Sequence, residues 1–352
     1  MNETKKINSE YKKPILYDFE IDELPSPKGM AKFRQKQLTE WLYDKGVQSF
    51  DEMSNLPKEW RKDLAENYLI SPFKQIKVFP SSDNSIRYLF TLRDGMQTEA
   101  VYMPYKTRKT ICISSMVGCP AGCAFCATGA MGFGRNLSKA EIIAQIMAVA
   151  YKEKIAPKEI RNVVLMGMGE ALLNYDNAIS AIKTMIDKRA LDMSARRITV
   201  STVGLPKQII RLAKEGLPLV LAVSLHAADD STRKEIIPTA NAHPVFEIIQ
   251  SLYEWQRLIN RRITIEYVML AGVNDSEWQA EVLAKQIKKL KKVHVNLIPF
   301  NSWGESKFKT SNNKIIRSFR KVLEHNGVEV SVRFSRGQDA GAACGQLALT
   351  KK

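Results

Sequence analysis

The sequence has no long apolar run and few cysteines, and each shortage excludes a class of protein. No stretch of its 352 residues approaches the roughly 18 uninterrupted apolar residues of a membrane-spanning helix. The first residues, Met1 to Lys6, are polar and lack the apolar region of a secretory signal. No internal repeat or low-complexity linker is visible. We therefore expect a cytoplasmic protein that has no contact with a membrane.

Acidic residues are also in short supply. Lys and Arg number 53 against 37 Asp and Glu, which gives a formal net charge of +16. Such an excess favours polyanions, because binding releases their condensed counterions. Anionic membrane surfaces would suit the same charge, and many basic proteins are merely soluble, so charge alone leaves the partner open. The hydrophobic content of 45% is sufficient for a large buried core.

Only five cysteines are present, and three of them lie within eight residues. Cys119, Cys123 and Cys126 form a CxxxCxxC motif, whereas Cys112 and Cys344 stand apart from it. In a reducing compartment such thiols are better interpreted as metal ligands or catalysts than as a disulfide framework.

The CxxxCxxC spacing predicts an iron–sulfur site. Three thiolates on one tight loop can each hold one iron of a [4Fe–4S] cluster, which leaves the fourth iron without a protein ligand. The amino and carboxylate groups of S-adenosylmethionine (SAM) can occupy that iron. A zinc site would need a fourth ligand, and no further Cys or His adjoins the motif. Three unlinked core cysteines would not need this spacing.

The hydrophobic pattern divides the chain into three parts. Residues 1–72 form a helical unit. Residues 73–107 suggest a β-hairpin connector, with a turn at Arg93-Asp94-Gly95. Residues 108–352 alternate strand-like and helix-like segments, which indicates an α/β fold with a parallel sheet. The expected strands are 111–115, 162–167, 197–202, 219–225, 263–269, 293–298 and 328–333.

Six or so βα units fit a partial, TIM-like (β/α)6 barrel better than a complete barrel of eight. In such a barrel the C-terminal ends of the strands carry the chemistry. The CxxxCxxC motif falls on the loop after the first expected strand, which is consistent with this arrangement.

The helical unit carries basic residues beside an apolar stripe. Phe33, Leu38 and Trp41 recur at helical spacing. Basic residues lie near the start of the same helix, at Lys28, Lys32, Arg34 and Lys36. They form either a solvated face or a surface that docks on RNA phosphates.

At this point the sequence resembles the RlmN/Cfr group of radical SAM RNA methyltransferases, and within it the adenine-C2 enzymes. The resemblance spans nearly the whole chain and combines Cys112, the cysteine triplet and Cys344. Further matching segments are Met166–Glu170, Ser224–Ala227, Gly272–Asp275, His294–Asn301 and Ala342–Leu347. Two residues depart from the group's usual pattern: Ala171 stands where Pro is common, and Gly341 where Asp is common. We expect Gly341 to loosen the segment that carries Cys344.

The resemblance implies a two-stage reaction that uses two SAM molecules per turnover. Cys344 takes a methyl group from the first SAM. The second SAM is cleaved at the cluster, and its 5′-deoxyadenosyl radical removes hydrogen from that S-methyl group. The methylene radical adds to adenine C2, Glu99 accepts the C2 proton, and Cys112 attacks the sulfur of Cys344 to release the RNA. Without the resemblance, Cys112 reads as a packed strand cysteine and Glu99 as a surface residue.

The resemblance also implies a SAM site and partners. The matching SAM-binding positions are Gly169, Glu170, Ser201, Ser224, Leu225, His226 and Asn301. The substrates would be 23S rRNA at the peptidyl-transferase centre and tRNA beside the anticodon. The reductant would be flavodoxin or ferredoxin, and the protein a monomer. The alternatives are a C8-methylating, Cfr-like enzyme, a non-catalytic iron–sulfur RNA-binding protein, and a radical SAM enzyme acting on peptides.

Overall fold

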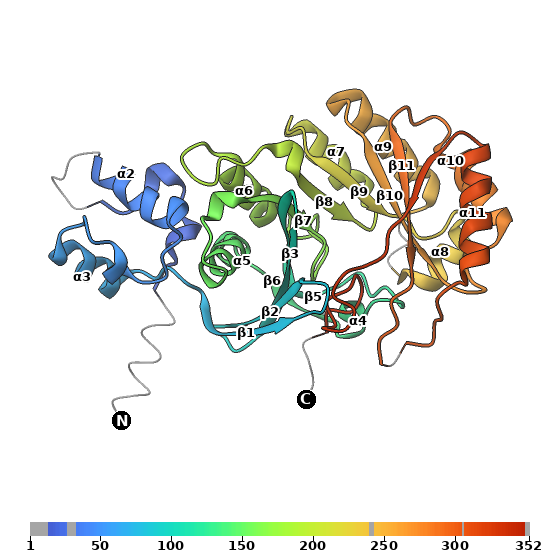
Figure 1. Ribbon diagram of the computed structural model, residues 1–352. Helices are drawn as coiled ribbons and strands as arrows, with labels where there is room; N and C mark the ends of the chain where they lie inside the picture. Colours follow the sequence, from blue (N-terminus) through green and yellow to red (C-terminus); the bar gives the residue numbers. More distant parts are fainter. Residues whose placement is uncertain (1–12, 27–32, 239–242, 305, 349–352) are drawn as a thin grey trace.

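A ten-stranded sheet organises the computed structural model, which describes residues 13–26, 33–238, 243–304 and 306–348. The strand order is β1-β2-β3-β4-β7-β8-β9-β10-β11-β12 (Figure 1). The strands are β1 (Phe73–Pro80), β2 (Ile86–Leu92), β3 (Gln97–Tyr105), β4 (Arg108–Cys112), β7 (Ile160–Leu165), β8 (Ile198–Thr202), β9 (Val220–Ser224), β10 (Ile263–Met269), β11 (Val293–Pro299) and β12 (Glu329–Val332). A separate ribbon pairs β5 (Met116–Gly118) with β6 (Phe133–Asn136).

From β4 to β12 all neighbouring strands are parallel, and helices form the crossovers between them. The helices of this part are α4 (Ala127–Ala130), α5 (Lys139–Lys152), α6 (Tyr175–Ile186), α7 (Pro206–Lys214), α8 (Asp230–Ile236), α9 (Val245–Ile259), α10 (Glu277–Ile287) and α11 (Asn313–His325). Short 3-10 turns are η5 (Pro157–Glu159) and η6 (Ala195–Arg197). β1 and β12 remain at the two edges, so the sheet is open. The predicted α/β class and incomplete barrel are confirmed.

The first predicted parallel strand was placed too late in the sequence. β4 begins at Arg108 and ends at Cys112, instead of covering 111–115. The reason is a tight turn that pairs Tyr105 with Arg108, so that β4 starts directly after β3 as its antiparallel partner. β1, β2 and β3 thus extend the parallel sheet at one edge, and Gly95, with φ of 86°, lies in the predicted turn between β2 and β3.

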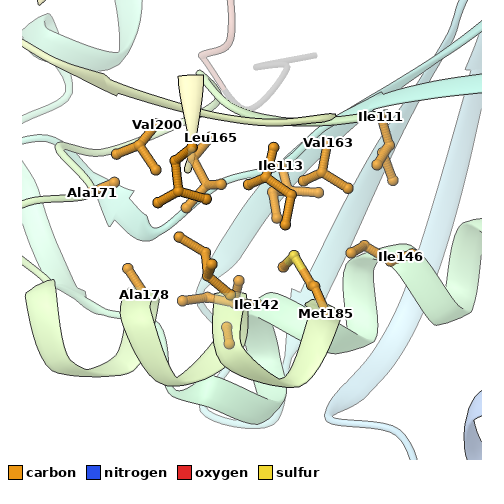
Figure 2. Packing of buried hydrophobic residues seen from close by; sticks show 14 of the residues in the cluster. Ile111, Ile113, Ile142, Ile146, Val163, Leu165, Ala171, Ala178, Met185 and Val200 are labelled. Carbon is orange, nitrogen blue, oxygen red and sulfur yellow. The ribbon is translucent and has the colours of Figure 1, made fainter. Parts of the chain in front are cut away.

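The core between the sheet and its first helices follows from the sequence pattern. β-branched and other apolar residues on β4 and β7 face α5 and α6, as Figure 2 shows for Ile111, Val163, Ile142 and Met185. Nearly all of α5 is buried, and the Ser138 side chain caps its first turn. This packing fixes the strand ends on which the site is built.

The N-terminal helical unit is confirmed, with one residue placed wrongly. Its elements are η1 (Leu16–Asp18), η2 (Ile21–Glu23), α2 (Phe33–Thr39), the π-helical turn η3 (Glu40–Asp44), η4 (Phe50–Glu52) and α3 (Lys58–Asn67). Leu38 and Trp41 are buried, but Phe33 is 55% exposed. Phe33 opens α2 at its first turn, outside the packed stripe.

Of the four basic residues near α2, Lys28 and Lys32 lie outside the described residues. Arg34 donates to Gln37 Oε1 at 2.8 Å and to the Asn55 carbonyl at 3.1 Å. The Lys36 ammonium is mostly exposed and lies 3.9 Å from Glu40. In the part of the chain that the structure describes, no helix is long and apolar enough to cross a membrane.

Candidate active site

The three motif cysteines occupy the loop between β5 and α4. Gly118 has a φ of 70°, and a Cβ there would lie 2.0 Å from the Gly132 carbonyl oxygen, so only glycine can open the loop. The Cys126 amide donates to the Cys123 carbonyl at 3.0 Å, and Cys126 precedes the first residue of α4. The loop thereby turns back on itself and gathers the three side chains.

The buried thiols fit a cluster of several irons. Burial is the main cause that raises the pKa of each thiol, to about 12 for Cys119, and Cys126 and Cys119 raise the pKa of Cys123 further. Without bound cations such thiols remain protonated. Among the described residues no three ligand side chains converge on one point as they would around a single ion. A cubane cluster needs no such convergence, because each thiolate binds a different iron.

Cys112 and Cys344 line the same cavity. The cavity opens to solvent and offers about 700 Å³ of space, and Cys126 of the loop also lines it. Cys344 is exposed, whereas burial raises the pKa of the Cys112 thiol to about 12, with a further rise from Cys344. The tertiary fold therefore brings together two cysteines that are 232 positions apart in the sequence, next to the motif loop.

Arg333 lines the same cavity as Cys112 and Cys344, which we call the cysteine cavity. It follows β12 directly and lines both the cysteine cavity and a second cavity of about 530 Å³. The pKa of Arg333 is raised first by the Cys344 thiol, and then by Glu266 and Cys112. No sequence motif singles out Arg333, although it stands at the end of the expected strand 328–333, where functional residues of such a fold lie.

The segment that carries Cys344 is held by the β1–β2 turn. Asp83 accepts from Arg336 Nε at 3.2 Å and from the Gly337 amide at 3.0 Å. Asp339 accepts from the Ser82 amide at 2.9 Å, and the Ala340 carbonyl accepts from Arg87 Nε at 2.7 Å. We call these contacts between residues 81–87 and 336–340 the turn clamp.

The same segment also contacts the cysteine loop. The Ala127 amide donates to the Gly345 carbonyl at 2.8 Å, and Figure 1 shows the C-terminal segment in red beside α4. Gly341, where we expect a looser segment, lies in a turn of the backbone. Gly341 adopts φ of 64° in a turn closed by its amide, which donates to the Gln338 carbonyl at 3.1 Å. Glycine fits that backbone without strain.

Glu99 is fully buried on β3, which contradicts the surface alternative. Its carboxylate forms an ion pair with Arg87, the same residue that donates to Ala340. Val101, two residues further along β3, lines the cysteine cavity, but Glu99 itself does not. Glu99 is thus linked to the segment of Cys344 through Arg87.

Three of the expected SAM-binding residues line the second cavity: Gly169, Glu170 and Ser201. Gly169 has a φ of 102°, and a Cβ there would lie 2.6 Å from the Met116 side chain. Burial raises the pKa of Glu170 to about 7, although its carboxylate accepts from the Val203 amide at 2.7 Å and the Leu172 amide at 3.1 Å. Met166 and Cys344 line this cavity too.

The other four expected SAM residues do not line that cavity. Ser224 Oγ lies 3.4 Å from Ser201 Oγ. Leu225 is fully buried, and its amide donates to the Glu266 carbonyl at 3.2 Å. His226 Nδ1 accepts from the Val268 amide at 3.1 Å, and burial lowers the pKa of this imidazole to about 3.

Asn301, the last of the four, is engaged by the Cys344 segment. Its Nδ2 donates to Ser335 Oγ at 2.8 Å and to the Cys344 carbonyl at 3.1 Å. Its Oδ1 accepts from Gln338 at 2.9 Å. Asn301 therefore connects the end of β11 to the loop of the exposed cysteine.

Comparison with known proteins identifies the family. The radical SAM superfamily model matches residues 113–297, and the ribosomal RNA large subunit methyltransferase N-terminal domain matches residues 19–70. A probable dual-specificity RNA methyltransferase RlmN of Thermus thermophilus is 53% identical over 337 residues, which are 96% of this chain and 93% of that protein. The chain belongs to the RlmN family of radical SAM methyltransferases.

Two further relatives agree. The Deinococcus deserti protein of the same name is 55% identical over 95% of this chain and 97% of its own length. A crystal structure of a radical SAM methyltransferase from Sphaerobacter thermophilus superposes with a TM-score of 0.92 at 39% identity, covering 96% of this chain and all of that one. The predicted family and enzyme class are confirmed, and membership implies a [4Fe–4S] cluster and SAM.

Proposed function

We propose that this enzyme methylates C2 of adenine in 23S rRNA, at the peptidyl-transferase centre, and in tRNA beside the anticodon. The observation that carries the proposal is the single cavity lined by Cys112, Cys344 and the cluster-loop residue Cys126. A simple RNA-binding protein needs neither of the first two thiols. The relatives' name, dual-specificity RNA methyltransferase, supports two RNA substrates.

The motif loop would hold the cluster through Cys119, Cys123 and Cys126. When bound, the cluster and SAM supply a one-electron cleavage that generates a carbon radical, with two SAM molecules consumed per turnover. Gly169, Glu170 and Ser201 would position SAM in the cavity that they line, with Ser224, Leu225, His226 and Asn301 supporting its wall. Glu170 can accept a hydrogen bond from an ammonium group.

Cys344 is the proposed methyl acceptor, because it is the exposed thiol of the pair and lies beside both cavities. The Arg333 guanidinium lines both of these cavities with Cys344, and a cysteine acts as a nucleophile through its thiolate. Cys112 is the proposed resolving thiol. After the RNA adduct has lost the C2 proton and one electron, which an oxidised cluster would accept, the Cys112 sulfur attacks the Cys344 sulfur. The carbon–sulfur bond to the RNA breaks, the released methylene carbon takes up the proton that Cys112 gives up and becomes the methyl group, and a disulfide remains.

Glu99 is the proposed acceptor of the C2 proton. Glu99 carries a carboxylate, the group that can accept a proton, and precedes the cavity-lining Val101 on the same strand face. Reduction of the Cys112–Cys344 disulfide after each turnover requires a thiol-reducing compartment, which favours the cytosol. A flavodoxin or ferredoxin would supply the electron to a monomeric enzyme.

The position of methylation is tested by reaction of anaerobically reconstituted enzyme with labelled SAM. The substrates are an rRNA fragment of the peptidyl-transferase centre and tRNA. Nuclease digestion and mass spectrometry against 2-methyladenosine and 8-methyladenosine standards should show the 2-methyl product. An 8-methyl product would assign the Cfr-like activity instead, and labelled protein without labelled RNA would contradict an RNA substrate.

The roles of the two cysteines are tested by their separate replacement. Cys112→Ala should still methylate Cys344 and attack RNA, but it should accumulate a covalent protein–RNA adduct that ribonuclease removes and thiols do not. Cys344→Ala should show neither protein methylation nor adduct while retaining the cluster. Normal turnover of Cys112→Ala would refute the resolving role, and an adduct in Cys344→Ala would show that the roles are reversed.

A further inference from the structure

Glu266 is a buried carboxylate in the wall of the second cavity, the one that Gly169, Glu170 and Ser201 line. It lies on β10, opposite Ser224 of β9 and Asn296 of β11 in the parallel register. Only 4% of the residue is exposed, and it lines the cavity together with Gly169 and Ser201. The resemblance assigned it no role, although it stands between two strands that carry expected SAM residues.

Only one of the two carboxylate oxygens of Glu266 is bonded. Oε1 accepts from Asn296 Nδ2 at 3.0 Å, and Asn296 is itself fixed by Ser331 Oγ at 2.9 Å. The other oxygen, Oε2, is buried and has no hydrogen-bond partner among the described residues. Leaving a buried charged acceptor unpaired is costly, so a rigid carboxylate of this kind indicates a bound donor.

Glu266 shares the wall of this cavity with a cation, Arg333. Burial raises its pKa, and the first group that opposes this rise is Arg333, followed by the hydrogen bond from Asn296. Because this cavity already holds the positive charge of Arg333, a neutral hydrogen-bond donor suits the remaining oxygen better than a second cation. SAM offers such donors in the two hydroxyl groups of its ribose.

We propose that Glu266 accepts a hydrogen bond from a ribose hydroxyl of SAM and forms a ribose subsite in this cavity. The proposal rests on the proposed function in one respect, namely that SAM binds among Gly169, Glu170 and Ser201. The ammonium end would lie at Glu170, whose side chain belongs to the strand end near the cluster loop, where it raises the pKa of Cys119. Glu266 lines the same cavity from another strand, β10.

The test measures binding, without turnover. Reconstituted holoenzyme is titrated calorimetrically with S-adenosylhomocysteine and with its 2′-deoxy and 3′-deoxy analogues. The wild type should bind one deoxy analogue about 10- to 150-fold more weakly, the range expected for one hydrogen bond to a charged acceptor. In Glu266→Gln, Oε1 stays with Asn296 and an amide nitrogen replaces the acceptor, so that this preference should shrink to a few-fold.

The affinities of wild type and variant for the ligands with and without the ribose hydroxyl form a thermodynamic cycle. A general loss of affinity caused by the substitution affects both ligands equally and cancels in this cycle. Glu141→Gln is the matched control, because Glu141 is also a buried carboxylate but pairs with Arg135 and does not line the cavity. This variant should keep the wild-type preference. Glu266→Met, which removes the acceptor outright, gives a second measurement should the Gln variant fold poorly.

Each other outcome overturns a specific statement. Equal binding of all three ligands by the wild type refutes the ribose subsite, and so does an undiminished preference in both Glu266 variants. A Glu266 variant that loses affinity for SAM but keeps it for S-adenosylhomocysteine would place Glu266 at the sulfonium instead. Failure of the wild type to bind either SAM or S-adenosylhomocysteine would refute the proposed function itself.

Discussion

Asp83 should control the effective concentration of the Cys344 thiol at the Cys112 thiol. Asp83 is the centre of the turn clamp, and its carboxylate bonds to Arg336 and the Gly337 amide, seven residues or so before Cys344 in the chain. Asp83→Ala removes both bonds, together with those that the carboxylate accepts from the Ser85 amide and hydroxyl, whereas the bond from Arg336 to the main-chain carbonyl of residue 83 remains. Each of the two bonds to Arg336 and Gly337 is worth roughly 0.5–1.5 kcal/mol net, and the Asp83 side chain is 34% exposed, so solvent screening places their total at about 1–2 kcal/mol.

That loss corresponds to a decrease of about 5- to 30-fold in the effective concentration of one thiol at the other. The assay uses a chain in which the three motif cysteines are Ser, so that only Cys112 and Cys344 can form a disulfide. Equilibration in glutathione buffers, followed by mass spectrometry, gives the effective concentration directly. Asp83→Asn should fall between wild type and Asp83→Ala, since it keeps the shape and loses the charge.

Asp94→Ala is the matched control. Asp94 also accepts from an arginine, Arg135, and from a backbone amide, that of Met96, but it lies in the other turn, between β2 and β3. It should leave the thiol equilibrium unchanged. If Asp83→Ala shifts the equilibrium by less than twofold, the turn clamp does not position Cys344, and the reasoning from these contacts is wrong.

Three further predictions concern the motif cysteines, His226 and Phe334. Replacing any one motif cysteine by Ala should abolish formation of 5′-deoxyadenosine; cleavage in a triple variant would contradict the cluster assignment. The folded pKa of His226 is about 3, below its ordinary 6.5, so its contribution to stability is complete above pH 6.5 and is lost as pH falls. His226→Asn should therefore reduce the slope of the unfolding free energy against pH, between pH 5 and 6, by up to about 1.4 kcal/mol per pH unit. The free energy is measured by urea titration at each pH. An unchanged slope would mean that His226 is also protonated in the folded protein at these pH values. Phe334 is 68% exposed in the wall of the cysteine cavity. Because one base–aromatic stack is worth about 1–3 kcal/mol, Phe334→Ala should weaken RNA binding about 5- to 150-fold in filter binding, whereas Phe246→Ala, equally exposed on α9, should not; equal affinities would show that Phe334 does not stack on RNA.

The sequence by itself determined the fold class and the motif chemistry. Strand-like and helix-like segments alternate because each βα unit buries one apolar face, and that periodicity is local. The spacing of Cys119, Cys123 and Cys126 is local as well, so the loop and its cluster could be predicted. Boundaries were less certain: β4 was misplaced because its start is set by pairing with β3, a contact outside its own segment.

Only the tertiary structure decided which distant residues share a cavity. Resemblance named Cys112 and Cys344, but nothing in their own neighbourhoods required them to line one space. Arg333 and Glu266 were missed because burial of a charge, and the partner that balances it, depend on strands that are far apart in sequence. The turn clamp likewise joins positions about 250 residues apart. Hydrogen bonds between such distant residues produce no periodic sequence pattern, so they could not be predicted from the sequence.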